Sequence, residues 1–304
     1  MDFSIPGKCL NRCSYCGYYE VNSEGKLSQE EILEVISQFA ALGGRSIKIV
    51  GEGEPLLRPD ICMIISAIRS HRLTPVLFTC GDVLADERLC ELVHGRPCLD
   101  LSQYLFDIGC TIVLKFESWQ QDEIVGRSGY SDLRNQALDK LLSLGFNKFY
   151  PSRLGFGTVL LKENFDQIKD VYIYTLKNNI YPLICPLMPI GRSKSKNWRD
   201  KIAPTQAEVR VLKQELIAIR GEHCSVAYPE SDFPGGRPCD IARCGMYMDD
   251  TGTCHICESD FSVGNIRFEP LQLLWKRVDL HKDRLYGSSR RRGLCHPKRR
   301  SGII

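Results

Sequence analysis

Several features are missing from this 304-residue sequence, and each absence excludes a class of protein. No apolar run approaches the roughly 18 residues that a membrane-spanning helix needs. The N-terminus has no basic stretch followed by an apolar one, which excludes a secretory signal peptide. The net charge is only +3, so composition gives no argument for nucleic-acid binding. We therefore expect no membrane partner and no nucleic-acid partner.

Cysteine, in contrast, is abundant, with 15 residues. In a short secreted chain such a count would indicate disulfides. Here the count is odd, the chain is long and the spacings are those of metal-cluster ligands. With 43% hydrophobic and 25% charged residues, the chain suits a globular protein with one large core, or a large domain and a small one. We expect a reducing cytoplasm as its location.

The first three cysteines, Cys9, Cys13 and Cys16, form a C-x3-C-x2-C pattern. This pattern resembles the radical S-adenosylmethionine (SAM) superfamily, in which three thiolates bind three irons of a [4Fe–4S] cluster and SAM fills the fourth iron. A zinc ribbon needs four ligands, so the alternatives are a broken zinc site or three structural thiols. The resemblance implies that Tyr15, just before the third cysteine, contacts the adenine of SAM.

A second motif, Gly51-Glu52-Gly53-Glu54-Pro55, begins 35 residues after Cys16. It resembles the "GGEP" motif of the same superfamily, which holds the amino group of SAM. Glycines let the backbone approach a ligand closely, and the Glu54 carboxylate can accept from an ammonium group. Glu52 stands where glycine is commoner, and we expect this departure to be tolerated.

Two basic residues are candidates for the carboxylate or ribose of SAM. Lys115 lies in the fourth expected strand, and Arg153 comes just before the fifth. The family often uses such positions, although either residue could equally be a surface or salt-bridge residue.

Strands and helices alternate along the first 190 residues, which predicts a parallel α/β sheet. The resemblance implies a partial (β/α)6 TIM-like barrel (residues 1–200) with a small C-terminal SPASM/twitch-like iron–sulfur domain (201–304). Nothing precedes the first strand, so we expect no separate peptide-recognition domain. We expect strands at 2–6, 46–51, 74–80, 111–116, 154–161 and 181–187, and helices at 28–42, 59–72, 86–109 in two pieces, 131–144, 164–179 and 204–220. The basic segment 191–203 is interpreted as a linker or, alternatively, a basic binding patch.

The C-terminal cysteines indicate a second cluster. Gly252 stands five residues before Cys257, and a Gly-Asn pair and a Leu/Trp segment follow. This order resembles the auxiliary-cluster portion of SPASM or twitch domains, without the second dense cysteine set of a full SPASM domain. The resemblance implies one auxiliary [4Fe–4S] cluster, because four thiolates complete such a site. Its implied ligands are Cys239, Cys244, Cys257 and Cys295.

Cys254 is then left over, three residues before Cys257. One interpretation is a hydrogen-atom donor, whose weak S–H bond quenches a carbon radical and whose thiyl is reduced again by the adjacent cluster. The alternatives are that Cys254 is itself the ligand or an inert buried thiol, and Cys224 is a rival for either role. The remaining cysteines are expected to be small core residues: Cys62, Cys80, Cys90, Cys98, Cys110 and Cys185.

Acidic residues dominate residues 224–260, where seven acids face two arginines. This balance suits a cationic substrate, although a solvated acidic surface is the alternative. The acids expected to receive ammonium groups are Asp232, Asp249, Asp250 and Glu258.

As a whole, the sequence resembles the radical SAM enzymes that modify aminoglycoside antibiotics. Among these it most resembles epimerases of the neomycin C to neomycin B type. It implies that the deoxyadenosyl radical takes hydrogen from a sugar carbon and that Cys254 returns one, with a flavodoxin- or ferredoxin-type electron donor. The alternatives are an aminocyclitol dehydrogenase, a peptide-modifying SPASM maturase and a non-catalytic iron–sulfur carrier. The Gly-Glu-Pro motif argues against a carrier, which needs no SAM site.

Overall fold

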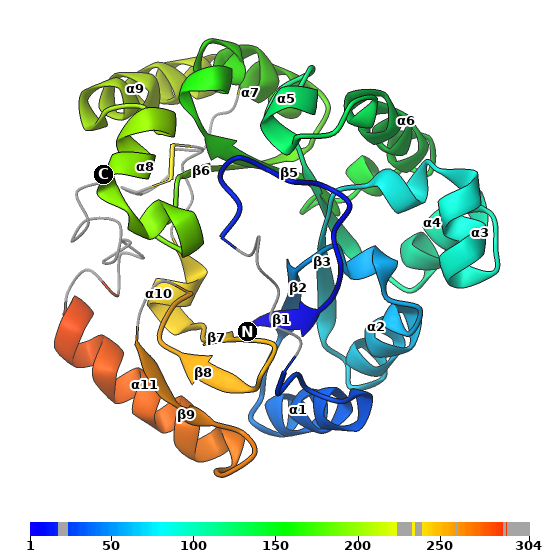
Figure 1. Ribbon diagram of the computed structural model, residues 1–304, viewed down its shortest axis with the longest axis vertical. Coiled ribbons are helices and arrows are strands. Elements are labelled where there is room, and N and C mark those ends of the chain that lie inside the picture. Colours follow the sequence, from blue (N-terminus) through cyan, green and yellow to red (C-terminus); the bar gives the residue numbers. More distant parts are fainter. Residues whose placement is uncertain (18–23, 224–232, 235–238, 259–260, 288–289, 291–304) are drawn as a thin grey trace.

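The computed structural model describes residues 1–17, 24–223, 233–234, 239–258, 261–287 and 290. In this part of the chain one sheet has the strand order β6-β5-β4-β3-β2-β1-β7-β8-β9. Its first six strands in the chain pair in parallel and curve into a partial barrel with helices outside (Figure 1). These strands are β1 (Asp2–Pro6), β2 (Ser46–Glu52), β3 (Thr74–Thr79), β4 (Thr111–Lys115), β5 (Leu154–Leu160) and β6 (Tyr181–Pro186).

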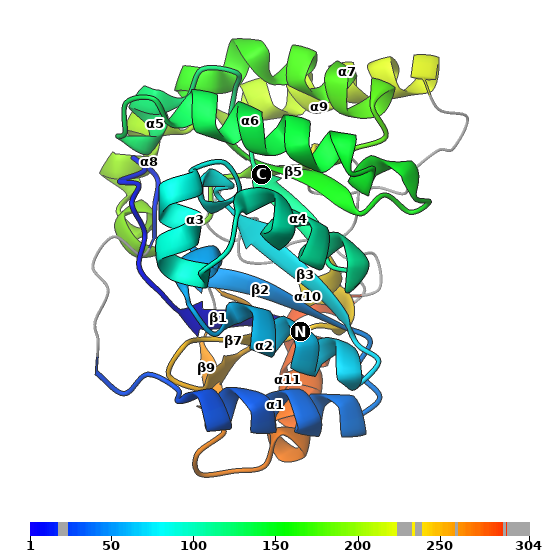
Figure 2. The ribbon, with the colours of Figure 1, turned by 90° about the vertical axis from the view of Figure 1, so that its right-hand side faces the viewer.

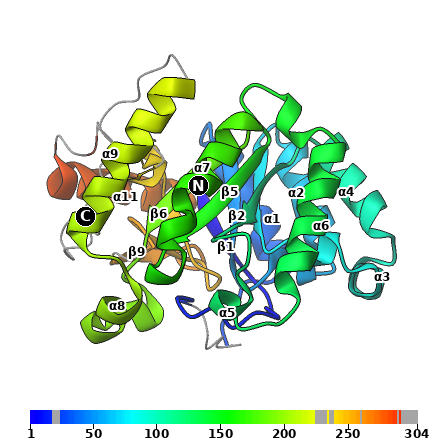
Figure 3. The same ribbon diagram turned by 90° about the horizontal axis from the view of Figure 1, so that it is seen from above.

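The helices cover the outer face of this sheet. Figure 2 shows α7 and α9 side by side at one end of the molecule, and α1 and α11 at the other. Figure 3 shows that α9 and α11 lie on the side away from α3, α4 and α6. Their bounds are α1 (Gln29–Ala41), α2 (Ile61–Ser70), α3 (Glu87–His94), α4 (Cys98–Asp107), α5 (Asp122–Val125), α6 (Tyr130–Ser143), α7 (Ile168–Lys177), α8 (Lys196–Ile202), α9 (Gln206–His223), α10 (Asp240–Cys244) and α11 (Leu271–Tyr286).

The predicted α/β barrel is confirmed, and the expected elements fall within a few residues of those observed. The first helix begins at the predicted capping box, with Ser28 N donating to Glu31 Oε2 at 2.8 Å. The segment 86–109 is two helices, because Gly95 ends the first in a left-handed conformation and Pro97 stands at the N-cap position of the second. The linker prediction for 191–203 was wrong. Ser195 accepts from Trp198 N and so begins α8, a cap signal inside a strongly basic stretch.

The two faces of the barrel sheet differ in burial. Phe3, Ile49 and Leu77 are register partners on the outer face, and they are fully buried against the helices. Side chains alternate along a strand, so Lys48 and Val76 face the interior, where they are only half-buried. The interior of the barrel is therefore lined by side chains that are not packed against a helix layer.

The C-terminal strands continue the same sheet. Residues Tyr247–Met248 (β7) pair in parallel with β1 and lead through a tight turn into the antiparallel strands Thr253–His255 (β8) and Ser262–Asn265 (β9). Phe39 in α1 and Trp275 in α11 contact each other with ring centres 5.5 Å apart. The division at residue 200 remains a prediction. Among the described helices, none is both long and apolar enough to span a membrane.

Candidate radical SAM site

The C-x3-C-x2-C loop follows β1 and crosses the mouth of the barrel (Figure 1). Two hydrogen bonds fasten it to α5, from Arg12 N to Val125 O at 2.7 Å and from Ser14 N to Ile124 O at 2.9 Å. Cys16 N donates to Cys13 O at 3.1 Å, which folds the last two cysteines into one turn. The amide of residue 11 points at Cys9 Sγ, 3.4 Å away. The loop thus brings the three predicted ligands together.

The surroundings of these thiols fit an iron–sulfur cluster. Both side-chain amide atoms of Asn11 and the hydroxyl of Ser14 are buried without a hydrogen-bond partner in the described structure, and such orphaned groups point to a missing partner. The described residues contain no set of three His, Cys, Asp or Glu side chains close enough for a single metal ion. A cluster does not need one, because each thiolate binds a different iron.

Gly51 and Gly53 bring the end of β2 against this loop. Gly53 has φ +152°, and a Cβ there would lie 2.6 Å from the carbonyl carbon of Gly7. A Cβ on Gly51 would lie 2.2 Å from Gly53 O. Glu54 N donates to Lys8 O at 2.7 Å, and Pro55 begins a short 3-10 helix. The predicted need for close backbone approach therefore has a direct geometric cause.

The Glu54 carboxylate is buried and heavily hydrogen-bonded. Its oxygens accept from Leu56 N at 3.0 Å, Thr79 Oγ1 at 2.6 Å and Cys80 N at 2.5 Å. Burial, with help from the charge of Asp82, raises the pKa of Glu54 to about 8. Glu54 therefore ties the end of β2 to the end of β3. A carboxylate has about four acceptor positions, which leaves room for an ammonium group.

Tyr15 and Lys115 meet where β4 ends. Lys115 Nζ donates to the Tyr15 hydroxyl and lies 4.4 Å from the ring centre, and that hydroxyl donates to Glu117. Burial raises the pKa of Tyr15 well above its usual value, as does the charge of Glu117. The sequence did not lead us to predict a role for Glu117. Its position could have indicated one, because it is an acidic residue two positions after Lys115, just beyond the end of a parallel strand.

Arg153 does not belong to this site, so its predicted role is wrong. It precedes β5, and the start of a parallel strand lies at the edge of the sheet opposite the cysteine loop. Its guanidinium donates to Phe106 O at 2.6 Å and to Cys110 O at 3.2 Å. Arg153 therefore braces helix α4 from outside the barrel.

Glu52, expected only to be tolerated, is part of an ionic cluster with Lys26 and Asp250. Lys26 Nζ lies 2.9 Å from Glu52 Oε2 and also pairs with Asp250. A backbone hydrogen bond links the same two segments, since Leu27 N donates to Asp250 O at 2.8 Å. Asp250 is almost fully buried in this cluster, so its predicted role as a substrate ligand is corrected to a structural one. The cluster joins the SAM motif to the β7–β8 turn.

Asp249, the first residue after β7, differs from its neighbour because it contacts His255, which pairs with Tyr247 on the interior face. It accepts from Thr253 N at 2.9 Å and contacts His255 Nε2 at 3.0 Å. Burial acts to raise the pKa of Asp249, but the hydrogen bonds from His255, Thr251 and Thr253 lower it overall. Glu258 is half-buried three residues beyond β8. Asp232 and the alternative donor Cys224 lie outside the described residues.

Three of the four predicted auxiliary ligands lie at the opposite edge of the sheet. Cys239 precedes α10 and Cys244 ends it, while Cys257 follows β8. Cys239 and Cys257 both lie within electrostatic range of Lys282, and Cys244 lies within that of the N-terminal amine. The buried Lys282 ammonium donates to the carbonyl groups of Ile241 and Gly245 and so fixes the loop around α10. Cys295 lies outside the described residues.

The structure contradicts the donor role predicted for Cys254. In the sheet Cys254 pairs with Gly264, where a Cβ would lie 2.6 Å from Leu274 Cδ2 of α11. Paired residues share a face, so the Cys254 thiol points to α11 and away from the interior. It is fully buried, and burial raises its pKa to about 12. Cys254 is a small core residue.

Two cysteines that were expected in the core lie on the interior side instead. Cys90, Cys98 and Cys110 are fully buried against the helices as predicted, and Cys62 packs beside them. Cys80 follows β3 and contacts the cysteine loop. Cys185 shares its face of the sheet with Lys115, because β4 pairs with β5 and β5 with β6 in that register. Periodicity alone cannot separate the two faces of a strand buried on both sides.

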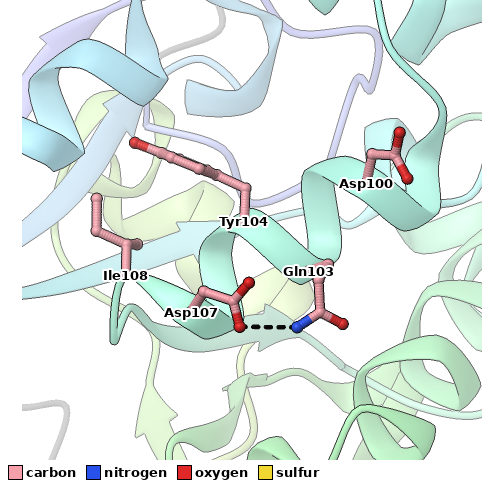
Figure 4. Close-up of a pocket in the computed structure, with 5 residues that line it drawn as sticks. All are labelled: Asp100, Gln103, Tyr104, Asp107 and Ile108. Carbon is pink, nitrogen blue, oxygen red and sulfur yellow. Dashed lines mark hydrogen bonds between the residues drawn. The ribbon is translucent and has the colours of Figure 1, made fainter.

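Cys185 lies at the same end of the barrel as the cysteine loop. It is half-buried in the second-last position of β6. The chain then turns onto the loop, where a Cβ on Gly17 would lie 2.7 Å from Ile190 Cγ1. Figure 4 shows a different hollow, which α4 forms around Tyr104 on the outside of the barrel. None of the five residues that line that hollow belongs to the site described here.

The comparisons agree with this geometry. A family model described as "Radical SAM superfamily" matches residues 3–174. GTP 3′,8-cyclase of Limosilactobacillus fermentum is 27% identical over 265 residues, which are 85% of this chain and 72% of the relative. GTP 3′,8-cyclase of Lactiplantibacillus plantarum is 26% identical over 264 residues, again 85% and 72%.

A crystal structure of Streptococcus suis SuiB shares the fold, with a TM-score of 0.61 and 16% identity. The similarity covers 90% of this chain and 65% of SuiB. The family model spans more than half of the sequence and includes the cysteine loop and the Gly-Glu-Pro motif. The chain belongs to the radical SAM superfamily.

Proposed function

We propose that the protein is a radical SAM epimerase that inverts a sugar carbon of a cationic aminoglycoside, as in the conversion of neomycin C to neomycin B. When bound, SAM and the cluster supply a 5′-deoxyadenosyl radical that removes a hydrogen atom from the substrate. Cys9, Cys13 and Cys16 would hold three irons. The Gly51–Pro55 backbone with Glu54 would hold the amino group of SAM, and Tyr15 and Lys115 would face its other end.

Inversion requires that a group inside the barrel gives a hydrogen atom to the substrate. The observation that carries the proposal is the position of the Cys185 thiol. Its half-buried thiol faces the interior below the cysteine loop. The substrate carbon would take the hydrogen atom of the S–H bond, forming a C–H bond and leaving a thiyl on Cys185. One electron from a flavodoxin- or ferredoxin-type donor and one proton from solvent would restore the thiol.

One carboxylate supports a cationic substrate. Asp249 contacts His255, which pairs with Tyr247 on the interior face. Asp2 on the adjoining strand, in contrast, is already ion-paired with Lys48 at 3.2 Å. The low pKa of Asp249 keeps its carboxylate ionised at neutral pH, so it can receive an ammonium group of the sugar. Glu258 and Asp232 remain further candidates for the same task.

The sequence relatives favour a second candidate. GTP 3′,8-cyclases share a quarter of their residues with this chain over most of its length, so a nucleotide cyclase is the main rival. The SuiB structure bound to its precursor peptide SuiA shares the fold at 15% identity, which supports the alternative of a peptide maturase through the fold alone. An aminocyclitol dehydrogenase would use the auxiliary cluster as electron acceptor and would need no thiol donor.

One anaerobic experiment separates these reactions. The protein with both clusters is incubated in deuterated water with SAM, reductant and either neomycin C or GTP, and products are analysed by mass spectrometry and NMR. We expect one deuterium at an inverted sugar carbon. A product lacking two hydrogens indicates a dehydrogenase, and turnover of GTP alone indicates a cyclase; either result refutes the epimerase.

A matched pair of variants tests the donor. Cys185→Ser is expected to cleave SAM without forming inverted product, since a serine O–H bond is too strong to give up its hydrogen atom. Cys110→Ser, in the core immediately before β4, is the control and should keep inversion. Full inversion by Cys185→Ser would refute the donor assignment and leave the epimerase intact.

A further inference from the structure

The basic segment 191–203 lies directly against the cysteine loop. At its start, Gly191 has φ +49°, and a Cβ there would lie 2.2 Å from the carbonyl oxygen of Gly17, which follows the third cysteine. At its end, Ile202 packs against the same apolar cluster as Tyr15 of the loop. Figures 2 and 3 show α8, the helix of this segment, at the same end of the barrel as α5, to which the loop is hydrogen-bonded.

The contacts that hold this segment in place do not neutralise its positive charge. Arg199 Nη1 donates to Ser193 O at 2.6 Å, and Lys162 Nζ donates to Asp200 O at 2.6 Å. Both acceptors are backbone carbonyl groups, so the two cations fix the chain without forming ion pairs there. None of the seven residues of α8 is buried. The helix therefore lies on the surface of the protein with its backbone held in place.

Exposed basic side chains lie on this segment and on the cysteine loop. The segment contains five basic residues and one acidic residue. Its Lys194, Lys196 and Lys201 are exposed, and none of the three forms an ion pair in the part of the chain that the structure describes. On the loop, Lys8 and Arg12 are exposed as well. We call these five residues the basic rim.

An apolar side chain accompanies the basic rim. Leu10, between Lys8 and Arg12 in the loop, is 47% exposed. Protein–protein interfaces combine an apolar centre with a polar rim. The surface therefore has the composition of a protein-binding site rather than that of a site for one small anion.

The position of the basic rim indicates what kind of protein it would bind. A [4Fe–4S] cluster held by the cysteine loop takes its electron from another protein, and electron transfer becomes slower with distance. The donor therefore has to dock at the surface nearest the loop, which is where the basic rim lies. Positive charge on this surface attracts a partner with an acidic face and steers the encounter.

We propose that the basic rim is the docking site for an acidic electron-transfer protein of the flavodoxin or ferredoxin type. In the docked complex the donor is oxidised by one electron and the cluster gains it, with no bond formed or broken. Lys194 and Lys196 hold the charge at the side of the loop that carries the third cysteine. This proposal rests on the radical SAM cluster and not on the epimerase, so it holds for any substrate.

The test uses the full chain with both clusters, under anaerobic conditions, and flavodoxin as the probe. The affinity of oxidised flavodoxin is measured by calorimetry, and cluster reduction by flavodoxin hydroquinone is followed by stopped-flow absorbance. Lys194→Glu/Lys196→Glu should lower the affinity and the second-order rate constant at least about tenfold at low salt. At about 1 M ionic strength, where the Debye length is about 3 Å, this variant and the unaltered protein should react equally.

Two controls separate docking from damage to the cluster. Lys148→Glu/Lys177→Glu changes the net charge by the same amount at exposed positions before β5 and β6, at the opposite edge of the sheet. It should keep most of the flavodoxin affinity and rate. Photoreduced deazaflavin, a small reductant that needs no docking site, should reduce the cluster of both variants as fast as that of the unaltered protein.

Three results would overturn the proposal. The first is equal flavodoxin affinity of the two double variants. The second is slow reduction of Lys194→Glu/Lys196→Glu by deazaflavin as well, since the lysines would then support the cluster itself. The third is displacement of flavodoxin by a DNA duplex of similar charge, since the surface would then attract any polyanion. None of these results depends on the substrate, so the proposed epimerase is tested separately.

Discussion

The burial of the ion pairs that Lys26 forms with Glu52 and Asp250 allows us to predict how much folding stability is lost when Lys26 is replaced. Lys26→Met removes the ammonium group that lies between two carboxylates whose side chains are 15% and 2% exposed. Breaking a buried ion pair on one side costs about 3–5 kcal/mol, because the remaining charge stays desolvated. Lys26 itself keeps some exposure, so we expect the lower figure of about 3 kcal/mol.

Thermal unfolding of the full protein, followed by circular dichroism, measures this loss. One kcal/mol shifts the midpoint by about 2 °C in a chain of this size, so Lys26→Met should melt about 6 °C lower. Lys169→Met is the matched control, because Lys169 and Glu215 form a single ion pair at 3.4 Å with about half-exposed side chains. Such a pair contributes under about 0.5 kcal/mol. Equal melting of the two variants would refute the reasoning.

The pH dependence gives an independent check. Burial and the neighbouring Asp250 raise the folded-state pKa of Glu52 to about 7. A raised carboxyl pKa favours folding while the group is protonated, and this contribution disappears as the pH rises from about 4.5 through 7. Without Lys26 the repulsion between the carboxylates grows, so the deficit of Lys26→Met should be larger at pH 8 than at pH 5.5. A deficit that is constant with pH would exclude carboxylate repulsion as its cause.

Three further predictions concern the site and its surroundings. Lys115→Met should weaken SAM binding at least tenfold in calorimetric titration, whereas Arg153→Met should leave it unchanged, because Arg153 lies at the other edge of the sheet; equal effects would contradict the placement of the two residues. Lys282→Met should release the loop around α10 and reduce iron content by about half, measured after anaerobic reconstitution, and full iron content would show that Lys282 does not support the auxiliary site. Gly157→Val adds a side chain to the interior face of β5, where its Cβ would lie 3.2 Å from Val113 Cγ1. This variant should lose substrate turnover but still cleave SAM in the absence of substrate. Normal turnover would mean that the substrate does not occupy this part of the barrel.

Local patterns predicted the elements of this fold well, because each depends on neighbours in the chain. Ser28 and Glu31 are three residues apart, and the capping box they form is a local event. The helix α8 was missed for a related reason. A single serine cap at Ser195 carries less weight in the sequence than the run of basic residues that follows it.

The roles of single residues were harder to predict, because they depend on the face and the end of a strand. Arg153 and Lys115 are both basic residues near strands, yet one precedes its strand and the other ends it. In a parallel sheet these two positions lie at opposite edges. Cys254 and Cys185 both stand in strands, and their faces are set by pairing with Gly264 and Val159. Such register becomes visible only when the strands are paired.

The β7–β8 turn connects the SAM motif in the N-terminal part of the chain with the candidate auxiliary-cluster cysteines in the C-terminal part. Its Asp250 contacts Lys26 and Glu52 beside the SAM motif, while Cys244 and Cys257 lie at the far ends of the same two strands. These strands have two and three residues and so span roughly 7–10 Å. The hairpin therefore fixes the distance between the two candidate cluster sites. If Lys26 holds the turn of this hairpin in place, Lys26→Met should slow electron transfer between the two sites and also lower the stability of the protein. If the ion pair has only a local effect, Lys26→Met should lower stability and leave electron transfer unchanged.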